Sequence, residues 1–309
     1  MEGWADVMDS MPRRVGLIGR PVSQSRSPAM QQAALDAAGI AARYELWDTP
    51  ASELRARVES LRQPETLGAN VTIPHKVAVI PYLDALATSA SRLTGAVNTI
   101  VREEGPRGAR LVGHNTDVTA VLRALDGEGV WTPGMRALIL GAGGGARAAL
   151  GAALLRGAWP WIAARRRSAA RAALEELYAR LDATPRDIQR QALALDDLDA
   201  LAAALSGTAL LINATPAGMR DPQAAPIPVG LLRHMPRTAF VMDMVYNPPE
   251  TALVRAARAA GLRVAGGLTM LLYQGAESFT LWTGTEAPLA VMRAALEAAL
   301  QAEGQGEMG

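Results

Sequence analysis

Short apolar segments alternate with alanine-rich helical patterns along this chain, and this alternation restricts its fold more than any other feature. The segments are residues 15–18, 44–47, 69–73, 138–140, 210–212 and 240–242. A repeated order of strand and helix favours α/β layers around parallel sheets. The length of 309 residues corresponds to about two domains. We therefore expect two α/β domains.

A glycine-rich turn follows the strand predicted at residues 138–140 and precedes an alanine-rich helix. The turn consists of Gly141, Ala142, Gly143, Gly144, Gly145 and Ala146. In a strand–turn–helix context, such glycines permit a tight turn and a close backbone approach, and the helix N-terminus can hold a pyrophosphate. The alternative is an ordinary turn rich in small residues. The pattern predicts a Rossmann domain that binds a dinucleotide.

Three arginines, Arg165, Arg166 and Arg167, stand where the second strand of this domain should end. An acidic residue roughly 20 residues after the glycine loop would bind the ribose of NAD, and none is present there. Guanidinium groups at this position could instead bind the 2′-phosphate of NADP through charge-assisted hydrogen bonds. A solvated cationic helix start and a nucleic-acid patch are the alternatives. NADP is the predicted cofactor.

The composition points to a small-molecule partner. Thirty-one basic and 30 acidic residues leave a formal net charge of +1, which offers no global attraction for nucleic acid or a membrane surface. There is no cysteine, and the three histidines are too scattered to suggest a metal site. No run is long and apolar enough to span a membrane, and residues 1–11 do not resemble a secretory signal. We expect a cytoplasmic location.

Polar residues in the first half stand at the edges of apolar segments. Lys76 follows the strand predicted at residues 69–73, where a desolvated ammonium group could act as a general acid for carbonyl reduction. An exposed surface lysine is the common alternative. Asn98 could bind a polyol, and Asp117 could accept a hydrogen bond from a substrate hydroxyl. Both could equally be turn or capping residues, with Asp117 capping a helix at residues 118–125.

These motifs, taken in order, resemble the shikimate dehydrogenase family over residues 15–282. The matching segments are residues 25–28, 68–76, 95–99, 115–117, 141–144, 212–216, 243–248 and 274–276. The resemblance implies an open-sheet α/β substrate domain, formed by residues 1–117 and 270–309. It also implies a Rossmann doubly wound NADP-binding domain at residues 118–269.

The resemblance also implies roles for individual residues. Lys76 and Asp117 resemble the catalytic pair of an oxidoreductase that reversibly reduces 3-dehydroshikimate with NADPH, a step of chorismate and aromatic amino-acid biosynthesis. Ser25 and Ser27 resemble the pair that binds the substrate carboxylate. The other substrate-binding residues would be Thr72, Asn98, Tyr246 and Gln274. The cofactor-binding residues would be 141–146, Arg165, Arg166, Asn213, Thr215, Met219, Val245 and Gly267.

One departure and several alternatives accompany this interpretation. Where the family usually has Asn-Arg-Thr after the second Rossmann strand, this chain has Ala164-Arg165-Arg166. A paralogue acting on quinate or an aminoshikimate is one alternative, and a non-catalytic NADP-binding regulator is another. Side-by-side kinetics with each substrate would distinguish such a paralogue from a shikimate dehydrogenase. The presence of both Lys76 and Asp117 disfavours the regulator, which would lack the catalytic pair. We expect a monomer or a homodimer.

Overall fold

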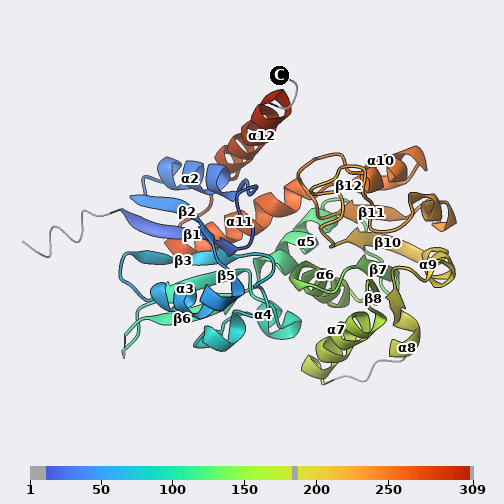
Figure 1. The fold of residues 1–309 in the computed structure, drawn as a ribbon, viewed down its shortest axis with the longest axis horizontal. Helices are drawn as coiled ribbons and strands as arrows, with labels where there is room; N and C mark the ends of the chain where they lie inside the picture. The colour runs from blue at the N-terminus through green and yellow to red at the C-terminus, as the bar shows by residue number, and fades with distance from the viewer. Residues whose placement is uncertain (1–11, 107, 183–186, 307–309) are drawn as a thin grey trace, which may run out of the picture. The chain divides into compact units, whose positions relative to one another are not determined.

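The computed structural model describes residues 12–106, 108–182 and 187–306 (Figure 1). The prediction of no secretory signal concerns residues 1–11, which lie outside this part, as do the outermost residues of the domain predicted at 1–117 and 270–309. None of the helices in the described part combines the length and the apolar character that a bilayer crossing requires. The chain divides into two compact units: unit 1 is Met1–Ser91, Ala96–Thr116 and Gln274–Gly309, and unit 2 is Arg92–Gly95 and Asp117–Tyr273.

Unit 1 is built on a six-stranded sheet of order β2-β1-β3-β5-β6-β4. Its strands are β1 (Arg13–Gly19), β2 (Ala42–Asp48), β3 (Thr66–Val71), β4 (Ala85–Leu86), β5 (Thr99–Glu103) and β6 (Arg110–His114). β1 is parallel to β2 and β3, whereas β5 is antiparallel to both β3 and β6. The sheet is therefore mixed, with β5 as the antiparallel strand of an α/β sheet whose other pairs are parallel. Residues 104–109 are too few for the crossover that a parallel β5–β6 pair would need.

Helices and apolar side chains cover this sheet. The helical elements are α2 (Ser27–Ala37), η1 (Ala51–Glu53), α3 (Leu54–Ser60), η2 (Ile80–Tyr82), α4 (Ser89–Thr94), α11 (Leu268–Thr283) and α12 (Leu289–Gly306). One core cluster joins Ile18, Ala69 and Ile100 of the sheet to Leu54 and Val58 of α3. On α2, Gln31 Nε2 donates to Gly275 O of α11 at 2.9 Å. The N-terminal and C-terminal segments of the chain thus form one unit.

Gly68 on β3 lies where a side chain cannot fit. Its φ is +152°, and a Cβ placed on it would lie 2.1 Å from Ile100 O and 2.7 Å from Trp282 Nε1. We expect Gly68→Ala to lower the free energy of unfolding by about 2–4 kcal/mol, because strain and a backbone clash act together. Gly39→Ala is the control, since Gly39 has a φ of +66° but nothing within 4 Å of a Cβ. Equal losses in urea unfolding of the two variants would contradict the clash.

Unit 2 is built on a six-stranded sheet whose strands are all parallel. The strands are β7 (Arg136–Leu140), β8 (Trp159–Ala164), β9 (Ala192–Ala194), β10 (Thr208–Asn213), β11 (Phe240–Asp243) and β12 (Arg263–Ala265). The order β12-β11-β10-β7-β8-β9 reverses direction between β7 and β10. This is the doubly wound Rossmann order, with its switch point beside β7. The predicted fold class is confirmed.

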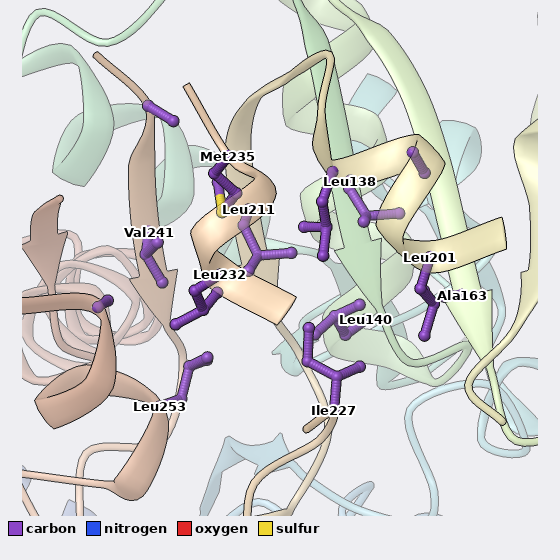
Figure 2. Packing of buried hydrophobic residues seen from close by; sticks show 14 of the residues in the cluster. Leu138, Leu140, Ala163, Leu201, Leu211, Ile227, Leu232, Met235, Val241 and Leu253 are labelled. Carbon is purple, nitrogen blue, oxygen red and sulfur yellow. The ribbon is translucent and has the colours of Figure 1, made fainter. Parts of the chain in front are cut away.

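Helices flank the strands of unit 2 along the sequence. They are α5 (Thr116–Asp126), α6 (Gly144–Leu155), α7 (Arg167–Arg180), α8 (Ile188–Gln191), α9 (Leu198–Leu205), η3 (Val229–His234) and α10 (Ala252–Ala259). Leu138, Leu140 and Leu211 of the strands belong to one buried core cluster with Leu232 of η3 and Leu253 of α10 (Figure 2). Burial of such side chains stabilises the sheet by roughly 1.5–3 kcal/mol each. The rigid core holds the loops at the strand ends.

Candidate active site

Several predicted substrate residues of unit 1 lie at one edge of its sheet. β1 and β3 end at this edge, and β5 begins there because it is antiparallel to β3. β3 ends at Val71, so the strand predicted at residues 69–73 is two residues too long. Val71 N donates to Asn98 O at 2.7 Å, and Val97 N donates to Lys76 O at 2.7 Å. These bonds place the backbone of half-buried Lys76 beside the start of β5.

Thr72 is held at the same edge. Its N–H donates to Ile18 O at 2.8 Å, and its carbonyl accepts from His75 N at 2.8 Å. The His75 ring is buried and its Nε2 lies 2.7 Å from Thr49 O. The turn between Thr72 and Lys76 is therefore pinned both to β1 and to the segment after β2.

Ser25 and Ser27 lie at the start of α2, close to its positive end. The N-cap of α2 is Arg26, and Ser27 is the first helical residue. Ser25 Oγ accepts from Ser27 N at 3.2 Å, so the first serine takes over part of the capping role. Ser27 is buried and Ser25 is half-buried. Hydroxyls at a helix N-terminus suit an anion.

A buried hydrogen-bond network fixes Asn98 and Gln274. Thr116 N donates to Asn98 Oδ1 at 2.8 Å, while Asn98 Nδ2 donates to Thr116 Oγ1 at 2.8 Å. Asn98 Nδ2 also lies 3.4 Å from Gln274 Oε1, and Thr116 Oγ1 donates to Gln274 O at 3.0 Å. Both ends of the Asn98 amide are thereby oriented. The structure brings together two residues that the chain separates by 176 positions.

A second layer supports this network and was missed from the sequence. Tyr44 Oη donates to Asn70 Oδ1 at 2.8 Å, and Asn70 Nδ2 donates to Ser278 Oγ at 3.0 Å. Ser278 Oγ donates to Gln274 O at 2.8 Å and lies 2.7 Å from Thr99 Oγ1. The spacing of Gln274 and Ser278, one helical turn apart on α11, is the signal that could have found this layer.

The glycine loop of unit 2 leaves β7 at the switch point of the sheet. Gly141 has a φ of +111°, and a Cβ on it would lie 3.0 Å from Ala214 O, so a side chain is disfavoured there. Gly143 is the N-cap of α6, which begins at Gly144. The first N–H groups of a helix have no acceptor within it, and the dipole adds positive potential. The loop therefore forms a backbone cradle whose polarity suits a pyrophosphate, and its binding of one stays a prediction.

The three arginines after β8 differ in their surroundings. Arg167 Nε donates to Ala192 O at 2.9 Å, and its Nη2 donates to Gln189 O at 2.5 Å. Arg165 and Arg166 are exposed, with Arg166 at the N-cap of α7. Arg167 thus supports the chain around α8. Arg165 and Arg166 directly follow β8, and their binding of an anionic ligand stays a prediction.

Residues predicted near the nicotinamide follow β10 and β11. Asn213 Oδ1 accepts from Thr215 N at 3.0 Å and from Thr215 Oγ1 at 2.7 Å. Gly267 N donates to Val245 O at 3.3 Å. Met219 is 43 % exposed, so its side chain is accessible in unit 2. The bond between Gly267 and Val245 brings the segment before α11 beside the segment that follows β11.

Met244 was not predicted as a site residue, yet it contacts the glycine loop. Its Cε lies 3.3 Å from the position of a Cβ on Gly145, at the start of α6. Any larger residue at position 145 would displace this thioether. In the sequence, the signal for Met244 as a site residue was its position directly before Val245 and Tyr246, which were both predicted to bind ligands.

The predicted catalytic pair is divided between the units. Lys76 belongs to unit 1, and Asp117 begins the main part of unit 2, which also contains Tyr246. Asp117 is buried in the first turn of α5. α5 begins at Thr116, so Asp117 is inside the helix and does not precede it as a cap. The pairing of Lys76 with Asp117 stays a prediction. Lys76 is also the only lysine of the chain.

The geometry of the two units defines a class of protein. Unit 2 has a doubly wound parallel sheet with a glycine cradle at its switch point. Unit 1 has a separate sheet with hydroxyl and amide side chains and the backbone of Lys76 at one edge. These are the features of a two-domain α/β protein whose Rossmann unit is suited to a dinucleotide.

Comparisons with known proteins identify the family. The model of the shikimate dehydrogenase substrate binding domain matches residues 17–100, and the model of the shikimate 5′-dehydrogenase C-terminal domain matches residues 267–297. The chain is 43 % identical over 294 residues to the shikimate dehydrogenase (NADP(+)) of Symbiobacterium thermophilum, covering 94 % of this chain and 96 % of that protein. The chain belongs to the shikimate dehydrogenase family.

Solved structures agree with this assignment. The shikimate 5-dehydrogenase of Thermus thermophilus, in complex with NADP(H) and shikimate, matches with a TM-score of 0.78 and 37 % identity, covering 93 % of this chain and 100 % of that one. The quinate dehydrogenase of Corynebacterium glutamicum, in complex with NAD, matches with a TM-score of 0.78 and 30 % identity, covering 93 % and 99 %. The family framework is thus shared by proteins with different substrates and cofactors.

Proposed function

We propose that the protein is an NADP-dependent shikimate dehydrogenase that reversibly reduces 3-dehydroshikimate to shikimate in chorismate and aromatic amino-acid biosynthesis. The observation that carries this proposal is the sheet edge of unit 1, where the backbone of Lys76 bonds to the residue before Asn98. Hydroxyl and amide side chains at this edge, with a lysine in the same turn, suit a small polyhydroxylated carboxylate better than a polymer. The family membership supports the same substrate class.

Lys76 would be the general acid and Asp117 its partner. Bound NADPH supplies a hydride to the carbonyl carbon C3 of the substrate. Lys76 Nζ donates a proton to the oxygen of that carbonyl, so the ketone becomes an alcohol as the amine becomes neutral. Asp117 would accept a hydrogen bond from a substrate hydroxyl. In the oxidative direction, the neutral amine accepts the proton.

The remaining polar residues would bind and orient the substrate. The Ser25 and Ser27 hydroxyls would take the carboxylate at the positive end of α2. Thr72, Asn98 and Gln274 would bind the ring hydroxyls, together with Tyr246. The buried bonds of Asn98 and Gln274 preorganise these amides, which lowers the entropic cost of binding.

NADP would occupy residues 118–269, and 1–117 with 270–309 would bind the substrate. The glycine cradle of residues 141–146 would hold the pyrophosphate; at Gly143, nothing lies within 4 Å of a Cβ position, which leaves room for a ligand there. Arg165 and Arg166 would bind the 2′-phosphate, while Asn213, Thr215, Met219, Val245 and Gly267 would surround the nicotinamide half. We further propose that the enzyme acts in the cytoplasm as a monomer or a homodimer.

A substrate and cofactor panel tests this function. Purified protein is mixed with shikimate, quinate or an aminoshikimate and with NADP or NAD, and the absorbance of the reduced nicotinamide is followed. We expect the highest kcat/KM for shikimate with NADP. The quinate arm matters because a quinate dehydrogenase shares this fold. Absence of activity with all three substrates and both cofactors would overturn the proposal.

A further inference from the structure

Asp243 is a completely buried carboxylate at the end of β11. Its exposed fraction is 0 %. Oδ1 accepts from Asn213 Nδ2 at 2.8 Å and from Val245 N at 3.0 Å, and Oδ2 accepts from Thr251 Oγ1 at 2.6 Å. These three donors are neutral, and burial raises the pKa of Asp243 above its ordinary value. A buried carboxylate is costly, and the mechanism proposed above assigns it no role.

Asp243 joins three segments of unit 2. Asn213 is the last residue of β10, Val245 lies in the segment after β11, and Thr251 is the N-cap of α10. The Thr251 hydroxyl also accepts from Val254 N at 3.2 Å, so one side chain connects the carboxylate to the helix. Two of these segments carry residues that we propose to surround the nicotinamide.

The carboxylate also sets the polarity of the neighbouring hydrogen bonds. An ionised carboxylate can only accept, so the amide nitrogen of Asn213 must face Asp243. The Asn213 oxygen then faces Thr215, where it accepts from both the N–H and the hydroxyl. Thr215 Oγ1 in turn accepts from Ala217 N at 3.2 Å. A chain of oriented bonds therefore runs from Asp243 to the loop after β10.

We propose that Asp243 is a positioning residue that holds the loops on the nicotinamide side of the cofactor site in one arrangement. This inference rests on the proposed binding of NADP. Because Asp243 is completely buried, it would act through its three donors, Asn213, Val245 and Thr251, and not by touching a ligand. Its effect should be confined to ligands that carry a nicotinamide, because the glycine cradle and Arg165 follow different strands.

Two probes separate this role from a general loss of structure. NADPH contains the nicotinamide half, whereas adenosine 2′,5′-bisphosphate contains only the adenosine half and the 2′-phosphate. In Asp243→Asn, Oδ1 can still accept but the amide nitrogen no longer accepts from Thr251. The variant should weaken NADPH about tenfold, the effect expected of losing a hydrogen bond to a charged group. Binding of adenosine 2′,5′-bisphosphate should change less than about twofold, within the spread of neutral surface changes.

Thr251 supplies the second pair of variants in case Asp243→Asn fails to fold. Thr251→Val removes the hydroxyl that donates to Asp243, and Thr251→Ser keeps it. We expect the valine variant to weaken NADPH selectively and the serine variant to restore it. Equal losses for both probes, or unchanged NADPH affinity in folded variants, would overturn the positioning role. A wild-type protein that binds neither probe overturns the cofactor assignment, and this inference with it.

Discussion

Replacing Lys76 with alanine should lower kcat about 10²- to 10⁴-fold, the range typical of a lost general acid. The hydride transfer would then leave an alkoxide without a positioned proton donor. Shikimate should still bind, because Thr72 and Asn98 are held by backbone and amide bonds that do not involve the ammonium group. Stopped-flow or steady-state kinetics give kcat, and calorimetry gives the shikimate affinity. The expected signature is a large fall in kcat with a small change in binding.

Lys76→Arg is the matched variant, since it keeps the positive charge but hardly releases a proton near neutral pH. If proton donation is the role of Lys76, the arginine variant should be nearly as slow as the alanine variant. Recovery of most activity by arginine would instead point to electrostatic stabilisation alone. Near-normal turnover in both variants would assign the proton donor to another residue.

The composition offers an independent check on Lys76. Because it is the only lysine, an amine-directed reagent can modify just this side chain and the α-amino group. Acylation should inactivate the enzyme, and saturating shikimate with NADP should protect it. Peptide mass analysis identifies which of the two amines was modified. Loss of activity with modification confined to the N-terminus would contradict the catalytic role.

The sequence predicted local features of this fold well because they depend on neighbouring residues. The strand before Gly141 and the helix after it follow from an apolar run, a glycine turn and small residues in direct succession. The antiparallel direction of β5 in unit 1 does not follow from the sequence, because strand direction depends on which strands pair and not on the apolar pattern of one strand. The start of α2 is also weakly marked, since its N-cap Arg26 makes no side-chain capping bond.

The site could be predicted as a set of residues but not as a network. Asn98 and Gln274 were each identified, yet nothing local shows that Thr116 bonds to both. Asp243 was quoted within a motif, but its burial and its three donors appear only once β10, β11 and α10 are assembled. Long-range bonds of this kind depend on the packed sheet.

The structure separates the three adjacent arginines into two groups. Arg167 donates hydrogen bonds to backbone oxygens around α8, whereas Arg165 and Arg166 are the predicted ligands of the 2′-phosphate. Replacing Arg165 and Arg166 together with alanine should weaken NADP about 10- to 100-fold, since each guanidinium bond to a phosphate contributes about 1.5–3 kcal/mol before exposure to solvent reduces it. NAD lacks the 2′-phosphate, so its affinity should change less than about threefold. Titration of both cofactors against each variant measures the ratio.

Arg167→Ala is the control that the structure supplies. Its guanidinium donates to Ala192 O and Gln189 O, so its loss should loosen the chain around α8 while leaving the NADP to NAD affinity ratio unchanged. The net charge falls by one in this variant, so it also controls for a general electrostatic effect of losing arginine. A ratio that shifts as much in Arg167→Ala as in the double variant would mean that positive potential near β8, and not contact by Arg165 and Arg166, selects the cofactor. Because long-range potential is screened by salt, repeating the titrations at high ionic strength would then reduce the effect in all variants alike.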